Sequence, residues 1–227
     1  MELTILMPCL NEANSIGICV NKAMGFIKKN NIDGEVLVSD NGSTDGSVEI
    51  AKNAGARVIH TPIKGYGSAL INGINNAKGK YVIMGDSDDS YDFSDLTGFV
   101  MKLREGYDLV MGNRFKGGIE KGAMPWHHQY IGNPVLSGIG RILYKSKIGD
   151  WHCGLRGFNR EKLLGLKLES PGMEFASEIV LKAEKAKFKS CEIPIILHKD
   201  KRIGKPHLRS FRDGMRHLRT LFKYRKK

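Results

Sequence analysis

The chain has 227 residues, of which 41% are hydrophobic and 26% charged, and its formal net charge is +12. This composition is that of a globular protein and excludes a disordered chain, and the length suits one α/β domain, or one domain with a small appendage. The longest apolar runs have about six residues, against roughly 20 needed to cross a bilayer, so no membrane span is predicted.

The positive charge is concentrated at the C-terminal end of the chain. From Lys199 onward there are twelve Lys and Arg against two Asp, which accounts for +10 of the total. The rest of the chain is almost neutral and carries no aromatic stacking platform, so we expect no nucleic-acid partner. The cysteines have no paired spacing and no secretory signal precedes them, which predicts reduced thiols, a cytosolic compartment and no zinc site.

Strand and helix patterns alternate along the first half of the chain. Four consecutive strand–helix units predict an α/β fold, a mostly parallel sheet flanked by helices on both faces. No Gly-x-Gly-x-x-Gly motif follows the first strand, so a dinucleotide ligand is disfavoured. Strands are predicted at Leu3–Met7, Glu35–Ser39, Arg57–His60, Tyr81–Met84 and Asp108–Met111, and helices from Ser15, from Thr44 or Asp45, over Tyr66–Ala77 and over Asp95–Arg104.

Carboxylates gather directly after the strand predicted at Tyr81–Met84. Like charges packed at a strand end repel one another, and a divalent cation is a common way to hold them together. Ligands of open α/β sheets also bind beyond the carboxyl ends of the strands. The alternative is a solvated turn in which Ser94 or Asp95 caps the next helix. The carboxylates are those of Asp86, Asp88, Asp89, Asp92 and Asp95.

Several motifs stand in a recognisable order along the chain. The first predicted strand ends in Pro8-x-x-Asn11-Glu12, the second in Asp40-x-Gly-Ser-Thr-Asp-Gly, and the fourth in Asp86-x-Asp88. Later segments are Lys64-Gly65-Tyr66-Gly67-Ser68-Ala69-Leu70, Gly112-Asn113-Arg114-Phe115, Gly132-Asn133, Asp150-Trp-His-Cys-Gly154-Leu-Arg156-Gly157-Phe158 and Gly172-Met-Glu174-Phe175. Together they resemble family-2 glycosyltransferases of the GT-A fold, and within them the polyprenyl-phosphate sugar synthases, which are similar to dolichyl-phosphate mannose or glucose synthase.

The resemblance implies that a hexose is transferred from a nucleotide diphosphate sugar. It places Pro8, Asn11, Glu12 and Asp40 around the nucleoside, although Asp40 would also suit an Asx turn at a strand end. Asn41 stands where many relatives have a second Asp. The diphosphate would meet the helix N-terminus that follows the Gly-rich turn. The remaining nucleotide-sugar residues that the resemblance implies are Lys64, Gly65, Ser87 and Glu174. For Glu174 there are two alternatives: it binds sugar hydroxyls, or it only places a charge at a helix start.

The resemblance also assigns a metal and a set of catalytic residues. Asp86 and Asp88 would hold Mg²⁺ or Mn²⁺, hard cations that prefer carboxylate and phosphate oxygens. Asp89 adds a ligand, orients one or contacts the sugar, and the sequence leaves these three roles open. Arg114 and Arg156 are forks for phosphate oxygens, and the alternative for each is a salt bridge.

A phosphate acceptor removes the need for a general base. A lipid phosphate is largely dianionic at neutral pH, because its second pKa is near 6, whereas a hydroxyl acceptor has to lose a proton. The resemblance implies single displacement with inversion at the anomeric carbon, so no acid or base residue is assigned. UDP-glucose or a related UDP-hexose is the expected donor, because the segment from Gly85 to Phe93 is similar to that of glucosyl-type relatives. GDP-mannose is the alternative donor. The alternative function within the fold is a transferase that extends a polysaccharide.

A basic amphipathic helix is predicted at the C-terminus, which divides the chain into a catalytic domain at 1–200 and a tail at 201–227. Basic side chains run beside an apolar stripe, a pattern typical of a helix on an anionic membrane surface. We therefore expect a peripheral protein at the cytoplasmic face of a membrane. Packing on the core, a homo-oligomer or a membrane partner protein are alternatives, and some relatives continue into transmembrane helices. The stripe is Leu208, Phe211, Met215, Leu218 and Phe222, and a second apolar stretch at 126–143 is a candidate contact for an isoprenoid chain.

Overall fold

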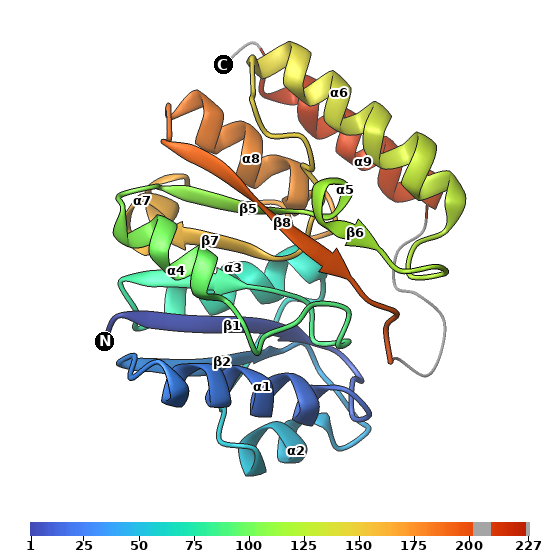
Figure 1. Cartoon of the computed structure of the whole chain (residues 1–227). Coiled ribbons are helices and arrows are strands. Elements are labelled where there is room, and N and C mark those ends of the chain that lie inside the picture. Colours follow the sequence, from blue (N-terminus) through green and yellow to red (C-terminus); the bar gives the residue numbers. More distant parts are fainter. Residues whose placement is uncertain (202–209, 226–227) are drawn as a thin grey trace.

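The computed structural model describes residues 1–201 and 210–225. In this part of the chain eight strands form one sheet in the order β3-β2-β1-β4-β7-β5-β8-β6 (Figure 1). The strands are β1 (Leu3–Cys9), β2 (Gly34–Asp40), β3 (Arg57–His60), β4 (Tyr81–Met84), β5 (Leu109–Asn113), β6 (Gly118–Ile119), β7 (Arg156–Asn159) and β8 (Ser190–Leu197). The predicted α/β fold with a mostly parallel sheet is confirmed.

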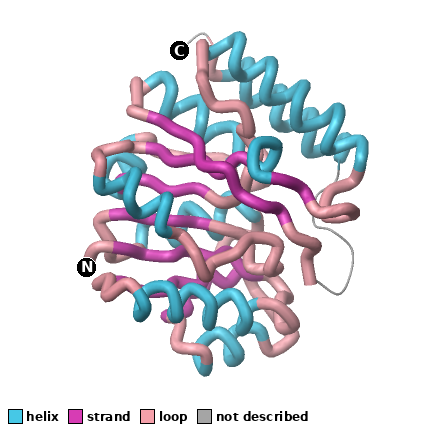
Figure 2. The backbone as a smooth tube through the Cα atoms, viewed as in Figure 1, coloured by secondary structure: helices cyan, strands magenta, loops and turns pink. Residues whose placement is uncertain are grey.

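Helices cover both faces of the sheet. α1 and α4 lie in front of it in Figure 1, and α3 and α7 lie behind it. Figure 2 shows the same alternation of strands and helices along the tube. The helices are α1 (Ile16–Lys29), α2 (Ser47–Asn53), α3 (Tyr66–Asn76), α4 (Thr97–Arg104), α5 (Arg114–Gly117), the π-helix η1 (His128–Gly132), α6 (Asn133–Tyr144), α7 (Arg160–Gly165), α8 (Phe175–Lys185) and α9 (Ser210–Lys223).

The core lies along β1 and β4, in which every residue is buried. The predicted elements of the first half are all present, with ends that shift by a few residues. α2 begins at Ser47 and α4 at Thr97, in each case two residues after an Asp whose carboxylate accepts the N–H of the first helical residue. These two aspartates, Asp45 and Asp95, therefore precede their helices and bond to the exposed N–H groups at the helix start.

β7 runs antiparallel to its two neighbours, which the alternation of strands and helices in the first half does not predict. It pairs with β4 through Met84–Arg156 and with β5 through Met111–Arg156. Because β7 runs in the opposite direction, its first residue lies at the edge where β4 and β5 end. This reversal brings Arg156 to the same edge as the carboxylates that follow β4.

α9 packs against the rest of the protein beside α6 and α8 (Figure 1). The Tyr144 hydroxyl of α6 donates to the carbonyl of Leu221 at 2.6 Å, and Lys185 of α8 donates to the carbonyl of Tyr224 at 3.0 Å. The boundary predicted at residue 200 stays a prediction, and Leu208 of the predicted stripe lies outside the described residues. No helix in the described part of the chain is long and apolar enough to cross a membrane.

Candidate active site

The predicted site residues lie at one edge of the sheet. β1, β2 and β3 are parallel to β4, so their carboxyl ends meet there, and β7 starts there. The Ser87 hydroxyl ties the ends of β4 and β1 together by donating to the Pro8 carbonyl at 2.7 Å. Carboxyl ends of strands are where open α/β sheets bind ligands. The residues at this edge include Pro8, Asn11, Glu12, Asp40, Lys64, Gly65, Asp86, Ser87, Asp88, Asp89, Arg114 and Arg156.

Hydrogen bonds join the loops that follow β1 and β2. The side-chain oxygen of Asn11 accepts from the N–H of Thr44, and the N–H of Asn11 donates to the hydroxyl of Ser43, both at 2.9 Å. Asn11 has a φ of 57°, a left-handed conformation that Asn adopts more readily than most residues. Next to it, the N–H of the buried Glu12 donates to the hydroxyl of Ser47 at 2.8 Å. Asn11 and Glu12, two of the predicted nucleoside residues, are thus bonded to the loop that follows β2.

Asp40 closes the β2 loop upon itself. Its carboxylate accepts the N–H of Gly42 at 3.0 Å and that of Ser43 at 3.2 Å. This is the Asx-turn arrangement that was the alternative for Asp40. A carboxylate has lone pairs for further hydrogen bonds, so a nucleoside contact is compatible with the turn, and the donor role of Asp40 stays a prediction.

Asn41 connects the end of β2 to the Gly-rich turn before α3. Its amide donates to the carbonyl of Ile63 at 2.9 Å, and its oxygen accepts the N–H of Gly65 at 2.7 Å. Gly65 has a φ of 139°, and a Cβ there would stand 2.1 Å from the carbonyl oxygen of Pro171, so no other residue fits. Lys64 is exposed beside this turn, which leaves its ammonium accessible to a diphosphate.

Asp86 lies between α3 and the loop before β7. Its Oδ1 accepts a hydrogen bond from the Tyr66 hydroxyl at 2.9 Å. On the other side, a Cβ at Gly154 would stand 2.4 Å from Oδ2, so the glycine of this motif leaves room for the carboxylate. Burial, and then the charge of Asp86, raises the pKa of the Tyr66 hydroxyl well above its ordinary value. Tyr66 is therefore a protonated donor that fixes Asp86.

Asp88 and Asp89 point to different partners. The carboxylate of Asp88 accepts the hydroxyl of Ser90 at 2.6 Å and its N–H at 3.1 Å. Asp89 has a φ of 63° and pairs with Lys22 at 2.8 Å and with Lys201 at 2.6 Å. Burial opposes the charge of Asp89, but hydrogen bonds from the two lysines lower its pKa overall. Both oxygens of Asp89 are thus ion-paired with lysines, and which of its three predicted roles it has stays a prediction.

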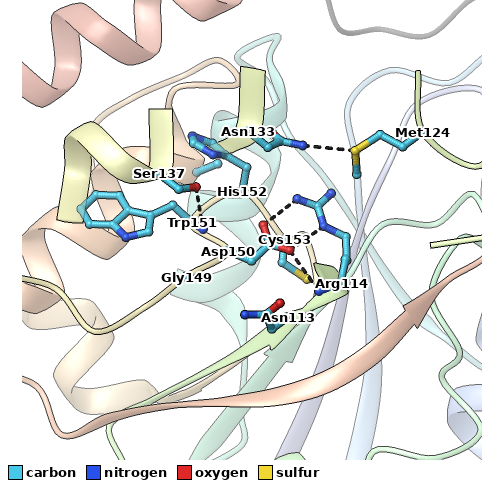
Figure 3. A network of polar contacts seen from close by, with 12 residues as sticks. Asn113, Arg114, Met124, Asn133, Ser137, Gly149, Asp150, Trp151, His152 and Cys153 are labelled. Carbon is cyan, nitrogen blue, oxygen red and sulfur yellow. Dashed lines mark hydrogen bonds and ion pairs between the residues drawn. The ribbon is translucent and has the colours of Figure 1, made fainter. Parts of the chain in front are cut away.

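Arg114 forms a buried, bidentate ion pair with Asp150 (Figure 3). Its Nε donates to Oδ2 at 2.8 Å and its Nη2 to Oδ1 at 2.7 Å, while its backbone N–H also donates to Oδ2 at 3.1 Å. This is the salt-bridge alternative, realised in the interior. Because Nε and one N–H of Nη2 are occupied, a phosphate contact by Arg114 depends on Nη1 and the second N–H of Nη2, and its role in transfer stays a prediction.

Arg156 is buried without an ion-paired carboxylate among the described residues. Its side chain is 2% exposed and donates to three backbone carbonyls, those of Cys153 at 2.6 Å, Ala176 at 3.1 Å and Trp151 at 3.3 Å. Its charge counteracts the rise in the pKa of Tyr66, which shows that it lies within electrostatic reach of the Tyr66–Asp86 pair. A buried charge of this kind attracts an anionic ligand, and this favours a phosphate role for Arg156 over a salt bridge.

Glu174 lies directly before α8 and faces α9. Its Oε1 accepts from the N–H of Gly172 at 3.3 Å and pairs with Nη2 of Arg216 at 3.1 Å. Its other oxygen, Oε2, is buried and accepts no hydrogen bond from the described residues. Glu174 thus places a charge at the start of a helix, which was one of its two predicted roles. The other role, a contact to sugar hydroxyls, stays a prediction.

Two histidines next to the site were not predicted as site residues. Nε2 of His152 lies 3.1 Å from the Ser177 hydroxyl, which lies 2.8 Å from Nδ1 of His217. Burial lowers the pKa of His217 to about 4, and burial followed by repulsion from His217 lowers that of His152 well below its ordinary value. His152 stands inside a motif that the sequence singled out, but no sequence signal pairs it with a residue of α9.

The carboxylates at the end of β4 fit a divalent cation that shares its ligands with a substrate. No group of three or more His, Cys, Asp and Glu side chains in the described part of the chain could hold a metal alone. Asp86 and Asp88 supply two hard oxygen donors, and Mg²⁺ is commonly held by one or two carboxylates together with substrate phosphates and water. The donor set therefore fits Mg²⁺ or Mn²⁺ bound with a diphosphate, and the metal site stays a prediction.

Comparison with known proteins gives the family. Residues 4–165 match the model of "Glycosyl transferase family 2", so the chain belongs to glycosyl transferase family 2, which confirms the resemblance. It is 39% identical over 220 residues to the low-salt glycan biosynthesis hexosyltransferase Agl6 of Haloferax volcanii, covering 96% of this chain and 52% of that protein. It is 28% identical over 214 residues to a dolichyl-phosphate hexose transferase of the same organism, covering 94% of this chain and 89% of that protein.

Solved structures share the fold. Glucosyl-3-phosphoglycerate synthase from Mycobacterium tuberculosis, in complex with Mn²⁺, UDP and phosphoglyceric acid, matches with a TM-score of 0.75 at 20% identity, over 98% of this chain and 78% of that one. A further complex of that enzyme, with Mn²⁺, UDP-glucose and phosphoglyceric acid, matches with the same TM-score over 99% of this chain and 80% of that one. The chain thus has the GT-A-like fold of these structures, as the resemblance implied.

Proposed function

We propose that the protein transfers a hexose from a nucleotide diphosphate sugar to a polyprenyl phosphate, with inversion and with the help of a divalent cation. The observation that carries this is the single edge at which Asp86 and Asp88, the Gly65 turn and the buried guanidinium of Arg156 meet. Family membership supports a glycosyl transfer, and the relative named as a dolichyl-phosphate hexose transferase supports a lipid phosphate acceptor.

In the proposed mechanism the chain's own groups position the two phosphates. Asp86 and Asp88 would hold Mg²⁺ or Mn²⁺, which would supply charge stabilisation to the diphosphate leaving group. Tyr66 fixes Asp86. The start of α3 would offer the diphosphate a favourable helix dipole, although the N–H groups of Gly65 and Ser68 already donate to Asn41 and Pro171. Pro8, Asn11, Glu12 and Asp40 bind the nucleoside. Arg156 draws the acceptor phosphate toward the site, and no residue has to remove a proton from it.

Exposed apolar side chains on α9 and before α6 support a lipid acceptor at the cytosolic face of an anionic membrane. Phe211 and Phe222 on α9 are 86% and 52% exposed, and Trp126 and Tyr130 before α6 are 67% and 70% exposed. α6 and α9 lie side by side (Figure 1). An isoprenoid chain would run along these helices while Trp and Tyr rings lie at the headgroup level. A second copy of the chain or a membrane partner protein is the alternative occupant.

UDP-glucose or a related UDP-hexose is the proposed donor, and GDP-mannose is the alternative. A second candidate function, extension of a glycan, is favoured by the 39% identity to a hexosyltransferase of glycan biosynthesis. A donor panel with undecaprenyl or dolichyl phosphate, in which release of the nucleoside diphosphate is followed, tests both. Release that depends on the lipid phosphate supports the proposal, whereas release that depends on a lipid-free glycan acceptor supports the alternative.

A further inference from the structure

The C-terminal helix α9 contacts the candidate donor site through its inward face. Arg216 of α9 pairs with Oε1 of Glu174 at 3.1 Å, and the side chain of Glu174 is only 9% exposed. The next residue of α9, His217, bonds to Ser177 in the first turn of α8. Adjacent residues of α9 thus bind both the residue before α8 and its first turn, so the position of α9 and that of Glu174 are coupled.

The loop before α8 is shaped to accept the Arg216–Glu174 pair. A Cβ at Gly172 would stand 2.6 Å from Oε2 of Glu174 and 2.9 Å from Nη1 of Arg216. Glycine at this position therefore lets the carboxylate and the guanidinium lie against the backbone. A long surface side chain that paired by chance would not require such a gap.

Within the described part of the chain, Arg216 pairs with Oε1 of Glu174 rather than with Oε2. Oε2 is buried and has no hydrogen-bond donor among the described residues, which is costly for a carboxylate oxygen unless a ligand supplies a donor. The same loop contacts the start of α3, where the N–H of Ser68 donates to the carbonyl of Pro171 at 3.1 Å and Gly65 packs against it. Glu174 therefore lies one loop away from the turn that faces the diphosphate.

We propose that Arg216 is a positioning residue of the donor site. It holds Oε1 of Glu174, so that Oε2 accepts a hydrogen bond from a hydroxyl of the donor sugar. This inference rests on the proposed function and deepens it, because it makes α9 part of the sugar subsite as well as the carrier of an outward apolar stripe. Arg216 acts through Glu174 and touches no substrate itself.

Calorimetric titration tests this, with the nucleotide sugar that binds best in the donor panel and with its free nucleoside diphosphate, both in Mn²⁺. Arg216→Gln is expected to weaken binding of the nucleotide sugar by about tenfold or more, because hydrogen bonds to charged groups are the stronger ones. Binding of the nucleoside diphosphate, which has no hexose, should stay unchanged. Arg216→Lys should restore part of the loss, and Arg219→Gln, on the exposed side of α9, is the matched control.

A double-mutant cycle with Glu174→Gln gives the second readout. If Arg216 acts through Glu174, Arg216→Gln should cost little further affinity once Glu174 is replaced. Equal weakening of nucleotide sugar and nucleoside diphosphate, or additive losses in the cycle, would overturn the inference in favour of a purely structural helix. Unchanged binding by Arg216→Gln would overturn it too, while the proposed function would stand. A wild-type protein that binds no nucleotide sugar in the panel would overturn both.

Discussion

The site has two halves, the loops that follow β1 to β4 and the residues from the end of β5 onward. The charged side chains of these two halves are held in place in different ways. At the ends of β2 and β4, Asp40 and Asp88 bond to groups within three residues of themselves. In the second half, charged side chains are partnered across long stretches of chain, as Arg114 is with Asp150 and Glu174 with Arg216. Asp86 and Asp89 also have partners distant in sequence, which are Tyr66 for Asp86 and two lysines for Asp89. The second half differs in that its Arg114–Asp150 ion pair is buried on both sides.

We expect this difference to distinguish residues that are needed for activity from residues that are needed for the stability of the fold. A strand-end carboxylate that a ligand completes should be replaceable by its amide without harm to the fold, because Asn keeps the shape and one acceptor oxygen for the partners of Asp. A buried ion pair is costly to break, since the remaining charge stays without compensation. Substitutions in the first half should therefore remove activity, and those in the second half should remove stability.

The largest expected effect is on turnover in the first half. Asp86→Asn and Asp88→Asn should each lower the transfer rate by about 10³-fold or more, because the neutral amide no longer attracts a cation that stabilises the leaving diphosphate. Urea unfolding should remain close to that of the wild type, and a chelator should inhibit the wild type reversibly. Full activity in excess EDTA, or in either variant, would remove the metal from the account.

A substitution that breaks the buried ion pair of the second half should lower the stability of the protein. Asp150→Asn leaves the buried guanidinium of Arg114 without its carboxylate, which should cost about 3–5 kcal/mol in the free energy of unfolding. Glu49→Gln, which breaks the exposed pair with Lys52, is the control and should cost less than about 1 kcal/mol. Urea unfolding measures both. Similar small losses in the two variants would mean that the buried pair is no more important than a surface one.

The histidines that join α8 to α9 predict a pH dependence of stability. The folded pKa of His217 is about 4, against about 6.5 in an unfolded chain. Below pH 6.5 the unfolded state therefore binds more protons, and stability falls as the pH drops from about 6.5 to 4, by up to about 3 kcal/mol from this residue. The lowered pKa of His152 adds to the loss in the same direction.

His217→Gln is the variant that checks this dependence. It removes one of the titrating groups, so its unfolding free energy, measured between pH 4 and 7, should fall less steeply than that of the wild type. Parallel pH profiles for the two proteins would show that His217 is already protonated in the fold or does not titrate in this range.

The smallest expected effect concerns the two faces of α9. Phe211 and Phe222 are exposed, so Ser at both positions should leave stability unchanged and weaken co-sedimentation with anionic vesicles by about tenfold. The electrostatic part of vesicle binding should weaken at high salt. Leu221→Ser, on the fully buried side, should instead destabilise the fold. Equal vesicle binding by the wild type and the double variant would favour a protein partner for this face.

The sequence predicted the first half well because its signals are local. Periodic apolar runs gave the strands, and Asp86 and Asp88 stood directly after one of them. The reversal of β7 was not predictable, since it depends on which gap in the sheet the strand enters. The partners of Arg114 and Glu174 were not predictable either, because 36 residues separate Arg114 from Asp150 and nothing in either segment indicates the other.

The C-terminal helix shows how one pattern can describe one face of a helix and miss the other. The stripe of Phe211, Met215 and Phe222 is exposed, as a surface-binding helix requires. The opposite face buries Asp213 and His217 against the protein. A polar face usually indicates solvent, and its burial became visible only once α6 and α8 were in place beside it.

The product of the reaction tests the central claim most directly. Wild-type protein is incubated with its preferred nucleotide sugar, Mn²⁺ and polyprenyl phosphate, and the lipid product is analysed by mass spectrometry and NMR. The account predicts a hexosyl phosphate lipid with an inverted anomeric carbon, formed in equal amount to the nucleoside diphosphate. Release of free hexose without lipid product, or a lipid product with the anomeric configuration of the donor, would contradict it.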